Sequence, residues 1–130
     1  MFVKLLDECT VVISETDDDV FGSAMESAVA YFETLYCRTG RRRQRYSIYR
    51  LPAWVDYNYQ WPVWVTYSNS LLVEDHTILV PRFRNGPNDE VQAIYQQASP
   101  DRHIVMIDSD AVIRLGGAVH CLTQQVPAVA

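Results

Sequence analysis

The stretch of this sequence best suited to chemistry is residues 116–125, which reads Gly-Gly-Ala-Val-His-Cys-Leu-Thr-Gln-Gln. Its cysteine, Cys121, is the type of side chain that needs least activation to attack carbon, because a small fraction of a free thiol is ionised near neutral pH. Gly116 and Gly117 let the backbone bend, or lie close to a ligand where a Cβ would clash. The pattern leaves two interpretations open: a nucleophile, or a small buried apolar residue.

Other polar side chains near Cys121 in the sequence are candidates for supporting roles. His120 is its direct neighbour, but successive side chains on an extended strand face opposite sides. We therefore expect a structural role for His120. Asp108 and Asp110 precede the stretch, and we expect them to cap the end of a strand.

The elements that position these residues begin with a predicted hairpin. Residues 2–6 and 10–13 are short apolar or β-branched runs around a polar turn. One of the aspartates 17–19 is expected to cap a helix, whose apolar residues recur at steps of three and four as far as Leu35. Gly40 is expected to end this helix, since glycine is favoured at helix C-termini.

The second half of the chain begins after a strand expected at residues 46–51, which Pro52 is predicted to stop. Residues 53–66 contain all three tryptophans, and we expect an irregular loop that either walls a substrate pocket or plugs the end of a sheet. The order of elements then repeats, with strands expected at residues 70–73, 77–80 and 103–107. Asn88 is expected to cap the intervening helix.

This order predicts an α/β fold built from two strand-strand-helix-strand units. Residues 5–13 align with residues 71–79, allowing about one residue of slip. Residues 1–52 would form the first unit and residues 67–130 the second, with the aromatic loop between them. Internal repeats of this kind indicate a propeller or an array of units.

The composition is that of one globular domain, with 130 residues, 48% of them hydrophobic. A net charge of −5 argues against binding nucleic acid, and no apolar run approaches the roughly 20 residues of a membrane span. Cys9, Cys37 and Cys121 are odd in number and far apart, which argues against a disulfide framework and against a zinc site. A reducing cytoplasm is the expected location.

Positive charge is concentrated in one short segment, residues 38–45, which contains five arginines. Such a cluster is typical either of an anion-binding or nucleic-acid-binding patch, or of a solvated loop. Because the chain as a whole is acidic, we expect the solvated loop.

Residues 116–125, followed by Pro127, resemble the C-terminal signature of the bacterial-type (Porphyromonas-type) peptidylarginine and agmatine deiminase family, which belongs to the guanidine-modifying enzymes. In that family the cysteine at the position of Cys121 is the nucleophile. The asparagine of a Tyr-x-Asn-Ser motif, matched here by Asn69, helps to position the substrate. Further segments with family counterparts are Met1–Asp7, Tyr49–Pro52, Tyr67–Leu72 and Ile78–Pro81.

The resemblance implies hydrolysis of the guanidinium of agmatine, or of free or peptidyl arginine, to a ureido product and ammonia. It implies no metal and no organic cofactor. It also implies a five-bladed α/β propeller with a central active site, of which this chain would be the C-terminal part. The family's catalytic His-x-Asp precedes the segment that Met1–Asp7 resembles, so we expect this chain alone to be inactive.

Deimination needs carboxylates that hold the guanidinium N–H groups, a thiolate, a general acid and a general base. By resemblance, this chain supplies the thiol of Cys121 and the amide of Asn69, and lacks the family's histidine and carboxylates. A second hypothesis is a non-catalytic truncated module. It would form homo-oligomers through the sheet edges and apolar faces that an interrupted propeller leaves uncovered.

Overall fold

The computed structural model describes residues 1–74, 76–124 and 126. The larger of its sheets has four strands in the order β1-β2-β5-β6. These strands are β1 (Val3–Leu5), β2 (Thr10–Glu15), β5 (Ser47–Asp56) and β6 (Val63–Thr66). β5 runs parallel to β2, whereas β1 and β6 run antiparallel to their neighbours.

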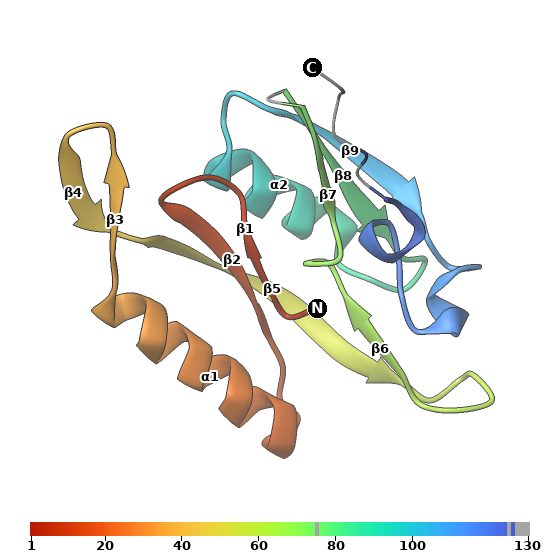
Figure 1. The fold of residues 1–130 in the computed structure, drawn as a ribbon. Coiled ribbons are helices and arrows are strands. Elements are labelled where there is room, and N and C mark those ends of the chain that lie inside the picture. The colour runs from red at the N-terminus through yellow and green to blue at the C-terminus, as the bar shows by residue number, and fades with distance from the viewer. Residues whose placement is uncertain (75, 125, 127–130) are drawn as a thin grey trace.

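A three-stranded sheet follows, with β8 at its centre. Its strands are β7 (Leu71–Val73), β8 (Thr77–Arg82) and β9 (His103–Asp108). β7 runs antiparallel to β8, and β9 runs parallel to it. The helix α1 (Asp19–Thr34) packs on one face of the larger sheet, and α2 (Asn88–Ala98) lies on the other face, between the two sheets (Figure 1). The chain therefore has the mixed α/β fold that the sequence predicts.

β2 is buried on both faces, which explains its unbroken apolar run. Val11 and Ile13 face α1 and pack with Met25, whereas Val12 faces the core formed with α2. All three strand residues are fully buried. Burying one such side chain is worth about 1.5–3 kcal/mol, so the strand is a major source of stability.

The main core joins the two halves of the chain. Val91 and Tyr95 of α2 are fully buried and belong to the same cluster as Leu51 of β5 and Ile78 of β8. One helix thus supports both sheets. The division into units at residues 52 and 67 stays a prediction, since this shared core does not mark a boundary between them.

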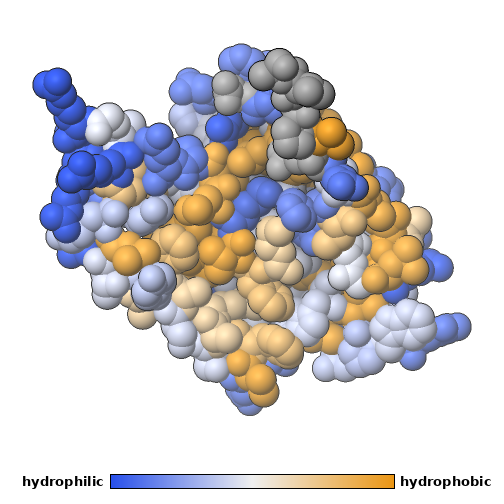
Figure 2. Space-filling model, viewed as in Figure 1, coloured by the Kyte–Doolittle hydropathy of each residue, from blue (hydrophilic) through white to orange (hydrophobic). Residues whose placement is uncertain are grey.

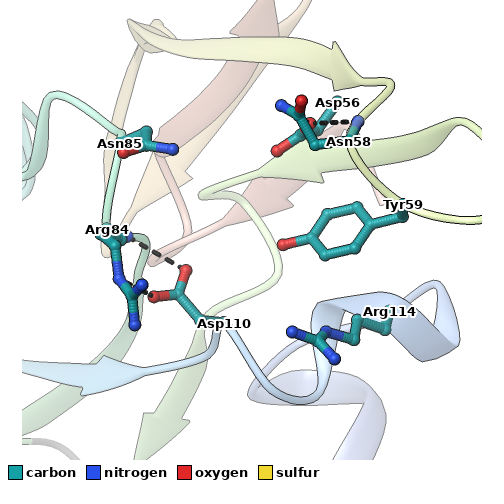
Figure 3. Close-up of a pocket in the computed structure, with 7 residues that line it drawn as sticks. All are labelled: Asp56, Asn58, Tyr59, Arg84, Asn85, Asp110 and Arg114. Atoms are coloured by element: carbon teal, nitrogen blue, oxygen red, sulfur yellow. Dashed lines mark hydrogen bonds and ion pairs between the residues drawn. The ribbon is translucent and has the colours of Figure 1, made fainter.

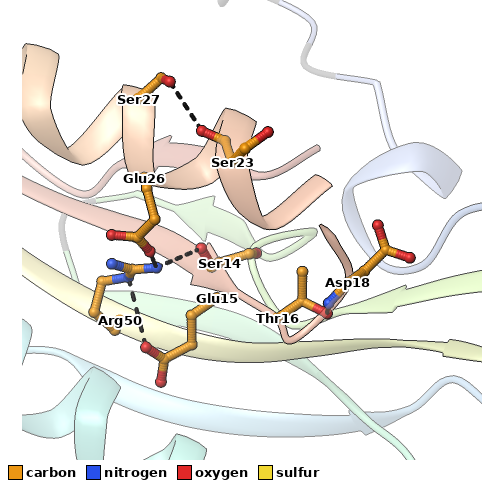
Figure 4. Close-up of polar contacts among 8 residues, drawn as sticks. All are labelled: Ser14, Glu15, Thr16, Asp18, Ser23, Glu26, Ser27 and Arg50. Carbon is orange, nitrogen blue, oxygen red and sulfur yellow. Dashed lines mark hydrogen bonds and ion pairs between the residues drawn. The ribbon is translucent and has the colours of Figure 1, made fainter. Parts of the chain in front are cut away.

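Arg50 links α1 to the larger sheet (Figure 4). Its Nη2 donates to Oε1 of Glu26 at 2.6 Å and to the main-chain oxygen of Ser14 at 3.3 Å. Its Nε lies 3.8 Å from a carboxylate oxygen of Glu15. The hydrogen bond from Arg50 and its positive charge lower the pKa of Glu26 from its ordinary value.

The start of α1 is predicted correctly and its end is not. The carboxylate of Asp18 accepts hydrogen bonds from main-chain N–H groups of the first turn. The prediction that Gly40 ends the helix is wrong, because α1 ends at Thr34 and is followed by a hairpin of β3 (Tyr36–Thr39) and β4 (Arg42–Arg45). Gly40 lies in the turn of this hairpin with φ +61°, a conformation that favours glycine.

The predictions that Pro52 ends a strand and that residues 53–66 are irregular are both wrong. β5 continues through Pro52 to Asp56, and residues 63–66 form β6. The ladder of β5 with β2 ends at Pro52, and its ladder with β6 begins at Ala53. Proline lacks an N–H, so it suits a boundary between two ladders. Residues 57–62 are the remaining loop.

The expectation that the cysteines do not pair is also wrong. Cys9 and Cys37 form a disulfide with their Cα atoms 5.3 Å apart. The reason is the hairpin: β3 brings Cys37 against the turn between β1 and β2, a contact that the sequence pattern did not reveal. The cysteine count therefore no longer supports a reducing cytoplasm, and that location stays a prediction.

No helix among the described residues is both long enough and apolar enough to cross a membrane.

Candidate active site

Cys121 lies on the short 3₁₀ helix η2 (His120–Leu122), and its thiol is free and exposed. Asn69 lies between β6 and β7, with only 3% of its surface exposed. Its Nδ2 donates to Sγ of Cys121 at 2.9 Å, and its Oδ1 accepts from the main-chain N–H of Cys121 at 3.2 Å. The structure therefore brings together the two predicted site residues, and the alternative of a buried apolar cysteine is wrong.

The two glycines before Cys121 have separate structural reasons. Gly116 follows the 3₁₀ helix η1 (Ile113–Leu115) and has φ +85°, in the left-handed region. Gly117 packs directly on the cysteine: a Cβ built there would lie 2.5 Å from Cβ and 2.8 Å from Sγ of Cys121. Any side chain at this position would displace the thiol.

A cluster of buried hydroxyl groups holds the chain just before Asn69. Oγ of Ser14 lies 2.9 Å from Oγ1 of Thr66 and 3.2 Å from Oγ of Ser68. Ser68 also donates to the main-chain oxygen of Met1 at 2.7 Å. Because buried polar groups are costly unless paired, this cluster fixes the segment in one position and places the start of the chain beside it.

Tyr95 holds the same segment from the side of α2. Its hydroxyl lies 2.9 Å from the main-chain oxygen of Tyr67 and 2.9 Å from Oγ of Ser70. Burial raises the pKa of Tyr95, so its hydroxyl stays protonated. Asn69 thus stands between two buried networks, which keep its amide aimed at Cys121.

Tyr67 connects the segment to the start of α2. Its hydroxyl donates to Oδ1 of Asn88 at 3.0 Å, and Nδ2 of Asn88 donates to the main-chain oxygen of Phe83 at 2.7 Å. The prediction that Asn88 caps α2 is wrong, because it is the first helical residue and its side chain turns back to the preceding loop. Burial, together with the negative charge of Asp110, raises the pKa of Tyr67.

His120 is not on an extended strand, as its predicted role assumed. In a 3₁₀ helix successive side chains point about 120° apart, so the imidazole and the thiol still diverge. The main-chain N–H of His120 donates to the main-chain oxygen of Asn69 at 3.1 Å. Burial and the positive charges of Lys4 and the N-terminal amine lower the pKa of His120 from 6.5.

Lys4 is a charged neighbour of His120 that the sequence analysis did not single out. It lies on β1, and burial lowers its own pKa. Its influence on His120 shows that it is near η2, although more than 110 positions separate the two residues in the sequence. No local pattern signals such a neighbour, because the contact depends on how β1 meets the C-terminal segment.

A separate polar hollow of about 430 Å³ lies where the loop 57–62 meets the segment leading to Cys121 (Figure 3). Arg84 and Asp110 form an ion pair at 3.7 Å on one side, and the guanidinium of Arg114 lies 5.6 Å from the ring centroid of Tyr59 on the other. The residues lining the hollow are Asp56, Asn58, Tyr59, Arg84, Asn85, Asp110 and Arg114.

The two aspartates before the cysteine stabilise the end of β9. Oδ1 of Asp108 accepts from the main-chain N–H of Asp110 at 3.1 Å, and Oδ1 of Asp110 accepts from the main-chain N–H of Arg84 at 3.1 Å. This agrees with the predicted capping role. Across residues 1–74, 76–124 and 126, no three His, Cys, Asp or Glu side chains gather as metal ligands would.

Comparison with known proteins gives a consistent family match over nearly all of the chain. The model of the Porphyromonas-type peptidyl-arginine deiminase family matches residues 1–127. A proposed agmatine deiminase of Streptomyces coelicolor is 30% identical over an alignment of 113 residues in length, and the match covers 78% of this chain and 30% of that protein.

Solved structures agree with the family model. A proposed arginine deiminase of Porphyromonas gingivalis superposes with a TM-score of 0.80 at 26% identity, covering 97% of this chain and 37% of that one. The agmatine deiminase of Enterococcus faecalis gives a TM-score of 0.77 at 21% identity, covering 97% and 39%, and shows likeness of fold alone. The chain spans between 30% and 39% of the length of these relatives.

Proposed function

Because the chain belongs to the Porphyromonas-type peptidyl-arginine deiminase family, we propose that it is the nucleophile-bearing part of a deiminase. The substrate is the guanidinium of agmatine or of free or peptidyl arginine. The products are a ureido compound and ammonia. The contact between Asn69 and Cys121 is the observation that carries this proposal.

The proposed reaction has two steps, and both pass through Sγ of Cys121. In the first step Sγ bonds to the guanidinium carbon, and one nitrogen leaves as ammonia after taking up a proton. This leaves a thiouronium attached to the cysteine. In the second step water adds to the same carbon, the C–S bond breaks, and the ureido product leaves with the thiol restored.

Asn69 would prepare the sulfur for the first step. A hydrogen bond from a neutral donor is stronger when the acceptor is ionised, so the Nδ2 donor interacts better with a thiolate than with a thiol. The amide has a fixed orientation, because its oxygen is engaged by the main chain of Cys121. The exposed position of the thiol leaves its other side open to a substrate.

Other groups must complete the chemistry. A guanidinium is held by carboxylates, and ammonia release and water attack need an acid and a base. We propose that segments of a longer protein supply these groups, and that this chain forms the last two units of a five-bladed propeller. Two features of the comparison with the proposed arginine deiminase of Porphyromonas gingivalis support this proposal. The chain covers only 37% of that protein, and it superposes on it with a TM-score of 0.80.

Alkylation by iodoacetamide near pH 7, located by mass spectrometry, tests the role of Cys121. Cys9 and Cys37 are joined in a disulfide, so glutathione serves as the ordinary thiol for comparison. We expect Cys121 to react faster than glutathione. A rate equal to or below that of glutathione would remove the support for a prepared nucleophile. Release of ammonia from agmatine by this chain alone would instead contradict the need for further segments.

A further inference from the structure

The hairpin of β3 and β4 stands apart from the rest of the fold. It is inserted between α1 and β5, whereas α2 leads to β9 without such an insertion. It pairs with neither of the larger sheets and extends from the body as a strongly hydrophilic arm (Figures 1 and 2). All four residues of β4 are exposed. Neither the core nor the candidate active site accounts for this arm.

The pairing register gathers positive charge on one face of the arm. Tyr36 pairs with Arg45, and Arg38 pairs with Arg43, so these four side chains share a face. The guanidinium carbons of Arg43 and Arg45 each lie 4.0 Å from the ring centroid of Tyr36. We call Tyr36, Arg38, Arg43 and Arg45 the arginine face.

Within the part of the chain that the structure describes, no carboxylate forms an ion pair with an arginine of the hairpin. The ion pairs found there involve Arg50 and Arg84. Two guanidinium groups held against one ring repel each other. An anion bound close to both would reduce that repulsion, so the arrangement is complementary to negative charge.

The opposite face of the hairpin is anchored. Cys37 is bonded to Cys9, and Oγ1 of Thr39 lies 3.3 Å from Sγ of Cys9. The arginine face is tied to the body as well, since Nη1 of Arg45 donates to the main-chain oxygen of Glu33 at the end of α1, at 2.7 Å. A surface held in place before binding loses less conformational freedom when a partner arrives.

We propose that the arginine face docks an acidic, extended segment of a partner protein. Arginine forks match carboxylates in bidentate pairs, and the two-stranded hairpin has free edges to which an extended chain can add. Nucleic acid fits less well, because Arg43 and Arg45 occupy the ring of Tyr36 that a base would need for stacking.

The test measures binding of a fluorescein-labelled peptide of ten glutamates to the full chain by fluorescence anisotropy at low salt. The triple variant Arg38→Ser, Arg43→Ser and Arg45→Ser should weaken binding at least about tenfold. A matched control removes three exposed arginines elsewhere, at positions 82, 84 and 114. It should change affinity by less than about twofold, and circular dichroism should show both variants folded.

Four outcomes would overturn the proposal. The first is equal loss of binding in both triple variants, which would mean that net charge alone is responsible. The second is tighter binding of a ten-nucleotide oligouridine than of the peptide. The third is no peptide binding at low salt. The fourth is self-association that only the hairpin variant abolishes, which would assign the arginine face to a second copy of the chain.

Discussion

Asn69 holds Cys121 at two points, through Nδ2 to the sulfur at 2.9 Å and through Oδ1 to the main-chain N–H at 3.2 Å. The two residues are 52 positions apart in the sequence. Because both ends of the amide are engaged, it cannot turn away from the sulfur without breaking both contacts. The thiol is therefore exposed to solvent on one side and held by a buried residue on the other.

Gly117→Ala should displace the thiol, since its Cβ would lie 2.5 Å from Cβ of Cys121. We expect a clear fall in the alkylation rate of Cys121. Gly116→Ala is the control, because it introduces backbone strain of about 1–2 kcal/mol at φ +85° but meets no atom within 4 Å. The control should lower stability in urea and leave the alkylation rate close to that of the wild type. Equal rates in the two variants would contradict the steric argument.

Tyr95→Phe should destabilise the fold by about 1–3 kcal/mol, because the main-chain oxygen of Tyr67 and Oγ of Ser70 would lose a buried partner. Urea unfolding followed by circular dichroism measures the change. Tyr57→Phe serves as the control, since Tyr57 is 73% exposed and should change stability by less than about 0.5 kcal/mol. A similar effect of both substitutions would show that the hydroxyl of Tyr95 is not a support of the site.

His120 makes stability depend on pH. Its pKa is lower in the folded chain than the ordinary 6.5, because burial and the charges of Lys4 and the N-terminal amine disfavour the imidazolium. Below pH 6.5 the imidazole of His120 therefore binds a proton more readily in the unfolded chain than in the folded chain. The free energy of unfolding falls as the pH drops from 6.5 toward the pKa of the folded chain.

The wild type should accordingly lose more stability between pH 7 and pH 5 than His120→Gln, measured by urea unfolding. In an NMR titration, Lys4→Met should move the pKa of His120 upward, because one positive neighbour is removed. An unchanged or lower pKa in that variant would contradict the proximity of the two residues.

The disulfide predicts a simple count of thiols. Unfolded but unreduced protein should react with one equivalent of a thiol reagent, at Cys121, and reduced protein with three. Cys37→Ser should lower the free energy of unfolding by about 2–4 kcal/mol, because the bond closes a loop across 28 positions. Three reactive thiols before reduction would show that the bond is absent in solution.

Much of the framework could be predicted because local patterns determine it. Asp18 caps α1, and the apolar run of β2 reflects burial on both faces. Cys121 and Asn69 were identified from the motifs around them, although only the structure shows their contact.

What could not be predicted depends on tertiary contacts. The segment 36–45 is rich in arginine and lacks the apolar alternation of a buried strand, so nothing marked it as a hairpin. The disulfide was missed for the same reason. The position of Pro52 at the boundary of two ladders, and the nearness of Lys4 to His120, arise only when distant segments pack together.

The rate of alkylation of Cys121 in Asn69 variants, measured from pH 6 to pH 9, tests the central claim most directly. Asn69→Leu removes the donor and Asn69→Asp replaces it with a carboxylate, so both should slow the reaction near neutral pH, the aspartate more strongly because its charge opposes the thiolate. Asn58→Ala, in the separate polar hollow, should match the wild type. If both Asn69 variants react as fast as the wild type across this range, Asn69 does not prepare Cys121 and the proposed nucleophile loses its main support.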